Sequence, residues 1–248
     1  MAARHAGKIV AITGGAGGIG QAIVQRLAAE GARIAIADLA DAAETLELAR
    51  QAGGEAAAYS VDIADWEQMC SFAAAVRARF GEPSIAIHCA ALQFMSAFED
   101  LSSERWRATS DVNVLGGFHL AKVFLPAMKR SRWGRIVMVA SSSFFAPPAR
   151  MSHYISSKGA LIGLVRGLAV EVGEFGITVN ALAPGLTRTR KAIEGVPPAH
   201  FAAVRARQAV ARNGEPEDQA AAISFMVSDD AAFMSGQTML MDGGEGHV

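Results

Sequence analysis

The sequence predicts an α/β protein built on one doubly wound, parallel sheet of about seven strands with helices on both faces. Short apolar runs rich in β-branched residues alternate along the chain with stretches of helical periodicity. This rotation favours parallel strands with helices packed on both faces. Because no linker-like composition divides the 248 residues, we expect one domain over residues 1–248. The expected strands are residues 8–13, 32–38, 55–62, 83–90, 134–141 and 176–184, with a last one between 235 and 244.

The segments between these strands carry helix signals. Apolar residues recur at helical spacing after the first strand, at Ile19, Ile23 and Leu27. Asp65, with Gln68 three residues later, resembles a capping box that opens a helix ending near Gly81. The helices therefore fill the gaps that a parallel sheet requires.

Composition excludes several classes of protein. With 51% hydrophobic and 19% charged residues, the chain is expected to fold compactly. A net charge of -1 gives no basic field for nucleic acid, and no apolar run reaches the 18 residues of a membrane span. Cys70 and Cys89 lie in apolar segments and suit buried, reduced thiols. We expect a cytoplasmic enzyme with no nucleic-acid partner, no membrane partner and no metal site.

The loop after the first strand predicts a dinucleotide site of the Rossmann type. Residues 13–20 read T-G-G-A-G-G-I-G, between a strand and a helix. Glycines there let the backbone turn tightly and bring a pyrophosphate to the helix N-terminus. Three glycine registers fit this loop, and a glycine-rich turn without a ligand is the alternative. In a doubly wound sheet the loops after Thr13, Ala90 and Ser141 should converge on the same site.

Asp38 indicates which dinucleotide would bind. It ends the second strand, 18 residues beyond Gly20, where a carboxylate can accept hydrogen bonds from the ribose hydroxyls. The same charge repels a 2′-phosphate, and the next residue is Leu39 rather than a basic one. We therefore expect NAD rather than NADP, the alternative being a solvated aspartate at a strand end.

Tyr154 and Lys158 form the motif with the most chemistry. Four residues apart, they share one face if the segment is helical. A tyrosine with a pKa of about 10 is a poor base near neutrality, and a nearby cation favours the phenolate. The pair is thus a candidate acid/base device, although Y-x-x-x-K alone also arises by chance.

Together with the glycine loop and the motif N-A-L-A-P-G at 180–185, this pair resembles the short-chain dehydrogenase/reductase family over nearly the whole chain. The resemblance implies a catalytic set of Ser141, which stands thirteen residues before Tyr154, together with Asn113, Tyr154 and Lys158. It also implies contacts of Asp62 and Ile63 with the adenine and of Thr189 with the nicotinamide carboxamide. The expected cofactor-binding residues are Gly14, Gly18, Ile19, Gly20, Asp38, Leu39, Asp62, Ile63, Ala90, Tyr154, Lys158, Pro184, Gly185 and Thr189.

The resemblance implies a specific proton path. Tyr154 as phenolate takes the proton of a substrate hydroxyl while hydride leaves the same carbon, and Ser141 holds the oxygen. Lys158 lowers the pKa of Tyr154 and binds the cofactor ribose. Asn113 holds a water that connects Lys158 to solvent.

The residues expected around the substrate are mostly apolar. They are Ser141, Ser143, Phe144, Phe145, Tyr154, Gln93 and Leu186. Such a wall suits a compact aromatic or alicyclic secondary alcohol. The chain looks most similar to the NAD-dependent 1-phenylethanol-type dehydrogenases, with the pyridoxal and sugar-alcohol dehydrogenases as alternatives. Residues 186–214 are expected to form a lid, whose basic residues either recognise an anion or form a solvated face.

Other classes are less compatible with the motifs. Enoyl reductases of the superfamily place six residues between the tyrosine and the lysine, and here three intervene. A non-catalytic NAD sensor or scaffold would have no reason to keep all four catalytic residues. One family motif departs, because His88-Cys89-Ala90-Ala91 replaces the usual Asn-Asn-Ala-Gly. His88 and Cys89 are interpreted as core residues, which leaves the bracing of the neighbouring strands in doubt.

The helix that carries Tyr154 also predicts a subunit contact. Gly159, Gly163 and Gly167 form a stripe along it, and each glycine in a helix interior costs about 0.8–1.0 kcal/mol relative to alanine. Three such residues suggest that another backbone comes close. The family forms dimers and tetramers through this helix, so a homo-oligomer is expected.

Overall fold

The computed structural model describes residues 3–246, and its centre is a parallel sheet of seven strands in the order β3-β2-β1-β4-β5-β6-β7. Every neighbouring pair is parallel, and the order reverses between β1 and β4. The strands are β1 (Ile9–Thr13), β2 (Arg33–Asp38), β3 (Glu55–Ser60), β4 (Ile85–His88), β5 (Gly134–Val139), β6 (Ile177–Pro184) and β7 (Thr238–Met241). The predicted doubly wound sheet is confirmed; β4 and β5 end two residues earlier than expected, where the site loops begin.

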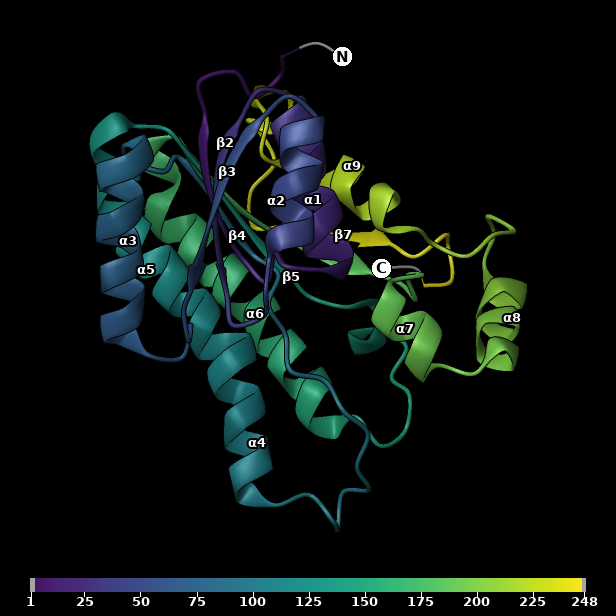
Figure 1. The fold of residues 1–248 in the computed structure, drawn as a ribbon. Helices are drawn as coiled ribbons and strands as arrows, with labels where there is room; N and C mark the ends of the chain where they lie inside the picture. The colour runs from purple at the N-terminus through teal and green to yellow at the C-terminus, as the bar shows by residue number, and fades with distance from the viewer. Residues whose placement is uncertain (1–2, 247–248) are drawn as a thin grey trace.

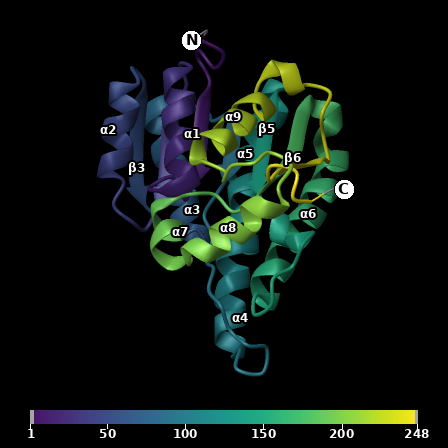
Figure 2. The same cartoon turned by 90° about the vertical axis from the view of Figure 1, so that its right-hand side faces the viewer.

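Helices cover both faces of this sheet (Figures 1 and 2). One face carries α1 (Gly18–Ala29), α2 (Ala43–Gln51) and α9 (Pro216–Met226), and α1 packs directly on α9. The other carries α3 (Trp66–Phe80), α5 (Gly116–Ser131) and α6 (Ser152–Val172). Beyond the carboxyl ends of the strands lie α4 (Ser103–Ser110), a π-helical turn (Asp111–Leu115), α7 (Arg190–Gly195) and α8 (Pro198–Arg207).

The boundaries of α3 follow from its capping residues. The Asp65 carboxylate accepts hydrogen bonds from the backbone N–H groups of Glu67 and Gln68, at 2.9 and 3.1 Å. Those groups have no partner inside the helix, so the cap satisfies them. Gly81 ends the helix with a φ of 97°, a conformation that favours glycine. The predicted start and end of this helix are therefore confirmed.

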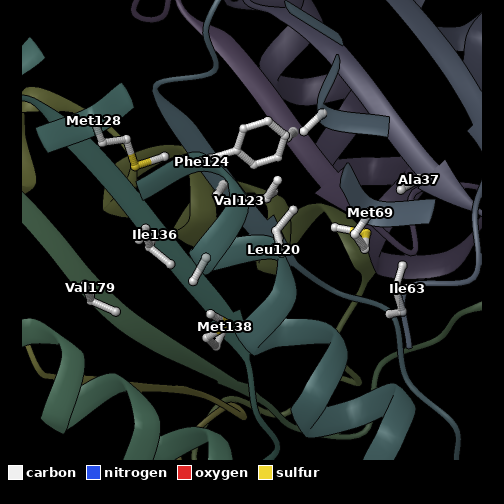
Figure 3. Close-up of a cluster of buried hydrophobic side chains, with 14 of the residues drawn as sticks. Ala37, Ile63, Met69, Leu120, Val123, Phe124, Met128, Ile136, Met138 and Val179 are labelled. Carbon is white, nitrogen blue, oxygen red and sulfur yellow. The ribbon is translucent and has the colours of Figure 1, made fainter. Parts of the chain in front are cut away.

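Two apolar layers hold the helices to the sheet. Figure 3 shows the layer on the α3, α5 and α6 side, where Phe124 and Leu120 pack over Ile136 of the sheet. On the opposite side Ile23 of α1 and Ile223 of α9 are fully buried. Each such side chain contributes about 1.5–3 kcal/mol through burial. The two layers make the sheet a rigid support for the loops at its carboxyl edge.

Two expectations from composition concern the cysteines and the possibility of a membrane-spanning helix. Cys70 and Cys89 are free thiols, as expected, but both are half-buried rather than buried. Within residues 3–246, no helix combines the length and apolar character needed to cross a bilayer.

Candidate active site

The loops after β1 and β4 meet at the carboxyl edge of the sheet. Thr13 and His88 are partners at the end of the β1–β4 ladder. A Cβ added to Gly14 would stand 2.4 Å from the backbone nitrogen of Ala90. The two loops are therefore in backbone contact, and the expected convergence of these loops is confirmed.

The glycine loop uses the register T-G-x-x-x-G-x-G. Gly14 and Gly18 have φ values of 73° and 56°, which favour glycine. A Cβ on Gly20 would lie 1.9 Å from the Gly14 carbonyl oxygen, so no larger residue fits there. The N-terminus of α1 consequently comes close to a tight, side-chain-free turn. That arrangement can cradle a pyrophosphate.

Asp38 closes the far side of this loop. Its carboxylate accepts hydrogen bonds from the backbone N–H groups of Ala16 and Ala40, both at 3.0 Å. Leu39 beside it is 70% exposed and leaves its surface free for a ligand. Along the same edge, the Asp62 carboxylate accepts a hydrogen bond from Ala64 at 3.0 Å.

Ile63, expected to meet the adenine, is buried. It packs against Gly116, where an added Cβ would lie 2.6 Å from its Cδ1 atom. Its carbonyl oxygen is 3.0 Å from His119 Nδ1. Ile63 is therefore held from two sides, on the edge of the sheet where the nucleotide loops lie.

Helix α6 places Tyr154 and Lys158 on the same side, against β5. Both are buried, at 8% and 1% exposure. The Lys158 ammonium donates to the carbonyl oxygen of Val139, 2.7 Å away, and lies 5.4 Å from the centre of the Tyr154 ring. Ser141 follows β5, and its hydroxyl is 2.8 Å from that of Ser143. The three predicted catalytic side chains thus come together.

Burial controls the protonation of this pair. It raises the pKa of Tyr154 to about 12, although the hydrogen bond with Ser141 acts in the opposite direction. It lowers the pKa of Lys158 to about 8. The lowering of the Tyr154 pKa by Lys158, aided by the oxidised nicotinamide, stays a prediction. The ammonium faces the Val139 carbonyl, and the desolvation of the phenol is the larger effect.

Asn113 lies in the π-helical turn and is fully buried. Its side-chain oxygen accepts from the backbone N–H of Leu92 at 2.7 Å, and its amide donates to the Leu92 carbonyl at 3.1 Å. The amide also donates to the Ser157 hydroxyl at 2.9 Å. Turns of this type occur frequently at functional sites. Asn113 therefore connects the loop after β4 to the catalytic helix, a role that its spacing in the sequence did not indicate.

The structure accommodates the residues His88-Cys89-Ala90-Ala91, which replace the family's usual Asn-Asn-Ala-Gly. His88 is completely buried and hydrogen-bonded through both ring nitrogens, to Thr13 at 2.8 Å and to Asn113 at 3.0 Å. The strands are therefore braced by an imidazole in place of the missing amides, which answers the doubt raised by the sequence. Burial raises the pKa of the Cys89 thiol to about 11, so that group is a poor nucleophile near neutrality.

The predicted substrate residues that follow the strands lie at the carboxyl edge of the sheet, in different surroundings. Phe144 packs on α6 next to the catalytic pair, since a Cβ on Gly159 would lie 2.5 Å from its ring. Phe145 instead lines a groove of about 620 Å³ beside Ala169, about four helical turns from Tyr154. The two aromatic rings are neighbours, with centres 5.2 Å apart, and Phe145 lies on the side of that groove. Gln93 and Leu186 are in the loops after β4 and β6, at the same edge of the sheet.

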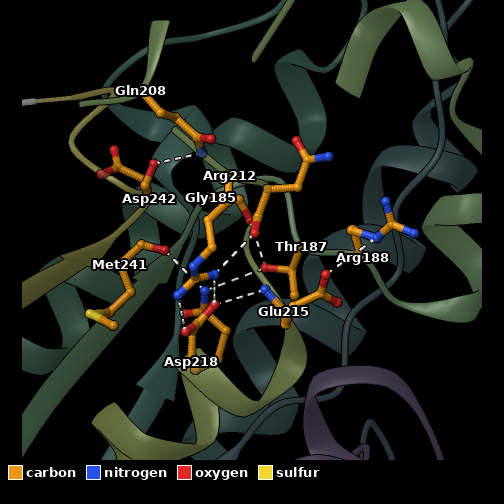
Figure 4. A network of polar contacts seen from close by, with 11 residues as sticks. Gly185, Thr187, Arg188, Gln208, Arg212, Glu215, Asp218, Met241 and Asp242 are labelled. Atoms are coloured by element: carbon orange, nitrogen blue, oxygen red, sulfur yellow. Dashed lines mark hydrogen bonds and ion pairs between the residues drawn. The ribbon is translucent and has the colours of Figure 1, made fainter. Parts of the chain in front are cut away.

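Residues 186–214 leave the sheet and return to it. Thr187 and Gly214 form a bridge at the base of the segment, and Arg212 pairs with Asp218 at 2.6 Å (Figure 4). At its start, the Thr189 side chain lies 3.2 Å from the position of a Cβ on Gly18. Thr189 thus lies beside the glycine loop, and its contact with the nicotinamide carboxamide stays a prediction.

Several basic residues of this segment are engaged by acids. Arg188 pairs with Glu215 at 3.3 Å, Arg190 with Glu44 at 2.8 Å, and Arg207 with Glu245. These pairs favour the interpretation of a solvated, ion-paired face over an anion site. Among residues 3–246, no group of three or more His, Cys, Asp or Glu side chains could hold a metal ion.

Comparison with known proteins gives consistent relationships. A family model described as Enoyl-(Acyl carrier protein) reductase matches residues 14–245. The chain is 36% identical over 246 residues to a 2,5-dichloro-2,5-cyclohexadiene-1,4-diol dehydrogenase of Sphingobium indicum, covering 96% of each chain. It is 33% identical to a D-beta-hydroxybutyrate dehydrogenase of Cupriavidus necator, covering 96% of this chain and 97% of that one. A solved Serratia marcescens short-chain dehydrogenase/reductase, a double mutant, superimposes with a TM-score of 0.90 at 28% identity, covering 98% of this chain and 99% of that one.

Proposed function

The chain belongs to the short-chain dehydrogenase/reductase family, and we propose that it is an NAD-dependent dehydrogenase that interconverts a secondary alcohol and a ketone. One observation carries the proposal. Tyr154, Lys158 and Ser141 come from α6 and the end of β5 and lie together, and Asn113 of the π-helical turn is bonded to α6 through Ser157, at the edge of the sheet that carries the glycine loop. Four residues of the types that acid/base chemistry on an alcohol needs, held at one edge, support an oxidoreductase rather than a nucleotide sensor.

Each residue has a defined role in the proposed reaction. In ketone reduction the Tyr154 phenol protonates the carbonyl oxygen, and in alcohol oxidation the phenolate takes the hydroxyl proton. Ser141 donates a hydrogen bond to that oxygen and also favours the phenolate. Lys158 holds a positive charge on the same side of the helix, and Asn113 orders the path by which the proton reaches solvent. When bound, the nicotinamide accepts or supplies the hydride.

The raised pKa of Tyr154 predicts how the rates of oxidation and reduction depend on pH. Burial keeps the phenol protonated near neutrality, which is the form needed to protonate a ketone. Oxidation of an alcohol needs the phenolate. We therefore expect oxidation to accelerate as the pH rises above neutrality, whereas reduction should keep its rate until the pH approaches that pKa.

The cofactor proposal depends on the glycine loop and on Asp38. The family uses nicotinamide cofactors, and the close backbone contacts at Gly14 and Gly20 admit no side chain, which keeps the turn before α1 tight. The Asp38 carboxylate, held by Ala16 and Ala40, lies where a 2′-phosphate would add a second negative charge. This supports NAD over NADP.

For the substrate we propose a compact alicyclic or aromatic secondary alcohol. Phe144 beside Gly159 presents an apolar wall, and the Sphingobium relative acts, by its name, on a cyclohexadiene diol. A pyridoxal or sugar alcohol is the alternative. The spacing of Tyr154 and Lys158 argues against enoyl reduction, although the matching family model carries that description.

The remaining proposals concern location and assembly. We propose a cytoplasmic homo-oligomer, a dimer or a tetramer. On α6, Gly163 and Gly167 have no atom within 4 Å of an added Cβ among the described residues, and Val170 is 86% exposed. Gly159 does not belong to that surface, because Phe144 covers it. Residues 186–214 are proposed as the lid, closing over the glycine loop through Thr189.

The deciding experiment mixes the protein with NAD and a panel of cyclic, aryl and aliphatic secondary alcohols and follows formation of NADH at 340 nm. We expect turnover with at least one cyclic or aryl alcohol and much weaker turnover with NADP. Silence across the panel, with NAD binding retained, would favour the non-catalytic alternative. Comparing a neutral aryl alcohol with its carboxylated analogue tests whether the basic residues of 186–214 contact substrate.

A further inference from the structure

The buried position of the His88 ring is not explained by apolar packing alone. Its ring is enclosed by the start of α5, where a Cβ on Gly117 would lie 3.0 Å from the ring and one on Gly116 3.4 Å. Two adjacent glycines thus provide the space for an imidazole. The side chain projects from the last residue of β4, directly opposite Thr13 of β1.

The hydrogen bonds of His88 define its tautomer. Nε2 is 3.0 Å from the carbonyl oxygen of Asn113, which can only accept, so Nε2 carries the proton. Nδ1 then accepts from the Thr13 hydroxyl at 2.8 Å. Burial lowers the pKa of His88 to about 3, and the ring is neutral at physiological pH. A neutral ring with one donor and one acceptor matches its two partners.

These two hydrogen bonds belong to a longer series in which each residue donates to the next, from Thr13 towards Tyr154. The Thr13 hydroxyl donates to His88, which donates to the Asn113 carbonyl. The Asn113 amide donates to the Ser157 hydroxyl at 2.9 Å, and that hydroxyl donates to the carbonyl of Tyr154 at 2.7 Å. All five residues are buried. The chain runs without a break from the last residue before the glycine loop to the backbone of the general acid.

We propose that His88 is a positioning residue that couples the nucleotide loop to the catalytic helix, by fixing Thr13 on one side and the Asn113 carbonyl on the other. This inference rests on the proposed function. If the ring is lost, the Asn113 carbonyl and the turn that holds it can shift relative to α6. A displacement of about 1 Å at a catalytic group can cost about 100-fold in rate.

The variants separate hydrogen bonding from packing. His88→Phe keeps a planar ring and removes both bonds, whereas His88→Gln carries a donor and an acceptor that can restore them. Thr13→Val removes the bond to His88 on the side of the nucleotide loop, together with the longer bond, 3.4 Å, that the Thr13 hydroxyl accepts from the Ala90 backbone N–H. We expect kcat at saturating NAD to fall between about 10- and 100-fold in His88→Phe, and to stay within about threefold in His88→Gln. Thr13→Val should raise KM for NAD and also lower kcat, though by less than His88→Phe, because it removes one of the two partners of His88.

His5 provides a matched control. It is equally buried and its ring is hydrogen-bonded, to Ser224 at 3.3 Å, but it precedes the amino end of β1. His5→Phe should lower thermal stability without changing kcat at temperatures where the protein is folded. An unchanged kcat in His88→Phe, or an equal loss in His88→Gln at equal melting temperature, would overturn the inference.

A spectroscopic measurement tests the same geometry without turnover. In ¹⁵N-labelled protein, long-range ¹H–¹⁵N spectra should show His88 as the neutral Nε2–H tautomer throughout pH 6–9. The Nδ1–H tautomer, or a charged ring, would overturn the inference even if His88→Phe does not fold. A wild-type protein that oxidises no alcohol would overturn the proposed function alone, and the spectrum would still decide the role of His88.

Discussion

Replacing Lys158 by methionine should change the pH dependence of stability in a way that isolates one buried charge. Lys158 is 1% exposed, and its amine has a single protein partner in the described structure, the Val139 carbonyl at 2.7 Å. Burial lowers its pKa from an ordinary 10.5 to about 8. The folded protein therefore carries a charge that the unfolded chain would solvate better.

The size of this effect follows from linkage. A pKa lowered from 10.5 to about 8 makes the charged amine cost about 3 kcal/mol of folding free energy at pH 7. The unfolded chain binds the extra proton between about pH 8 and 10.5, so the cost fades as the pH rises through that window. At pH 9.5 about 1 kcal/mol remains, and the wild type should thus gain about 2 kcal/mol from this group.

Methionine has a similar length and carries no charge. Losing the hydrogen bond that the neutral amine donates to Val139 costs about 0.5–1.5 kcal/mol at both pH values, because the contribution of the charge is already contained in the pKa. Relative to the wild type, Lys158→Met should therefore be about 2 kcal/mol more favourable at pH 7 than at pH 9.5. Urea unfolding at the two pH values measures this difference, with Lys191→Met, on the exposed side of α7, as control. A stability difference that does not change with pH would refute the buried-charge argument.

Three further substitutions test other parts of the structure. Asp38→Asn should raise the ratio of kcat/KM for NADP to that for NAD by about tenfold or more, measured with a good alcohol substrate, because the charge opposing a 2′-phosphate is removed. Ser224→Ala removes a hydrogen bond that, with Arg26, holds the pKa of buried Glu30 below its ordinary value in spite of desolvation. In urea unfolding it should cost about 1.5–3 kcal/mol at pH 7, and less as the pH falls below the ordinary pKa of a glutamate and then through the lowered pKa of the folded carboxylate. Gly14→Ala should destabilise the fold by at least about 2 kcal/mol through its φ of 73° and a backbone clash, whereas Gly17→Ala, with a φ of -166° and open space, should not.

Much of the fold could be predicted because its signals are local. Alternating strand and helix patterns, the Asp65 cap and the turn at Gly81 each act within a few residues, and the structure has them at the expected places. Strand ends were less accurate. The segment after His88 remains apolar in sequence, but its backbone leaves the sheet to meet the glycine loop. Only the neighbouring loop determines that exit, so periodicity could not detect it.

In the site, too, local features could be predicted from the sequence, whereas features that depend on contacts between distant elements could not. Spacing along α6 and the distance from Ser141 to Tyr154 identify the residues, because these are properties of one helix and one strand end. The pKa of Tyr154 depends instead on how closely other elements enclose it, which no spacing encodes. The role of His88 also needed three dimensions, since its partners lie 75 and 25 residues away. A residue that looked like a core replacement is a hydrogen-bonded connection between two parts of the site.

We propose above that Tyr154 performs acid/base chemistry on an alcohol beside bound NAD. Tyr154→Phe removes one hydroxyl and keeps the ring, so the measurement is its kcat with NAD and the best alcohol of the panel, together with NADH affinity by fluorescence titration. We expect turnover to fall at least about 1,000-fold while NADH affinity changes less than about threefold. Turnover within tenfold of the wild type, with NADH binding intact, would contradict it.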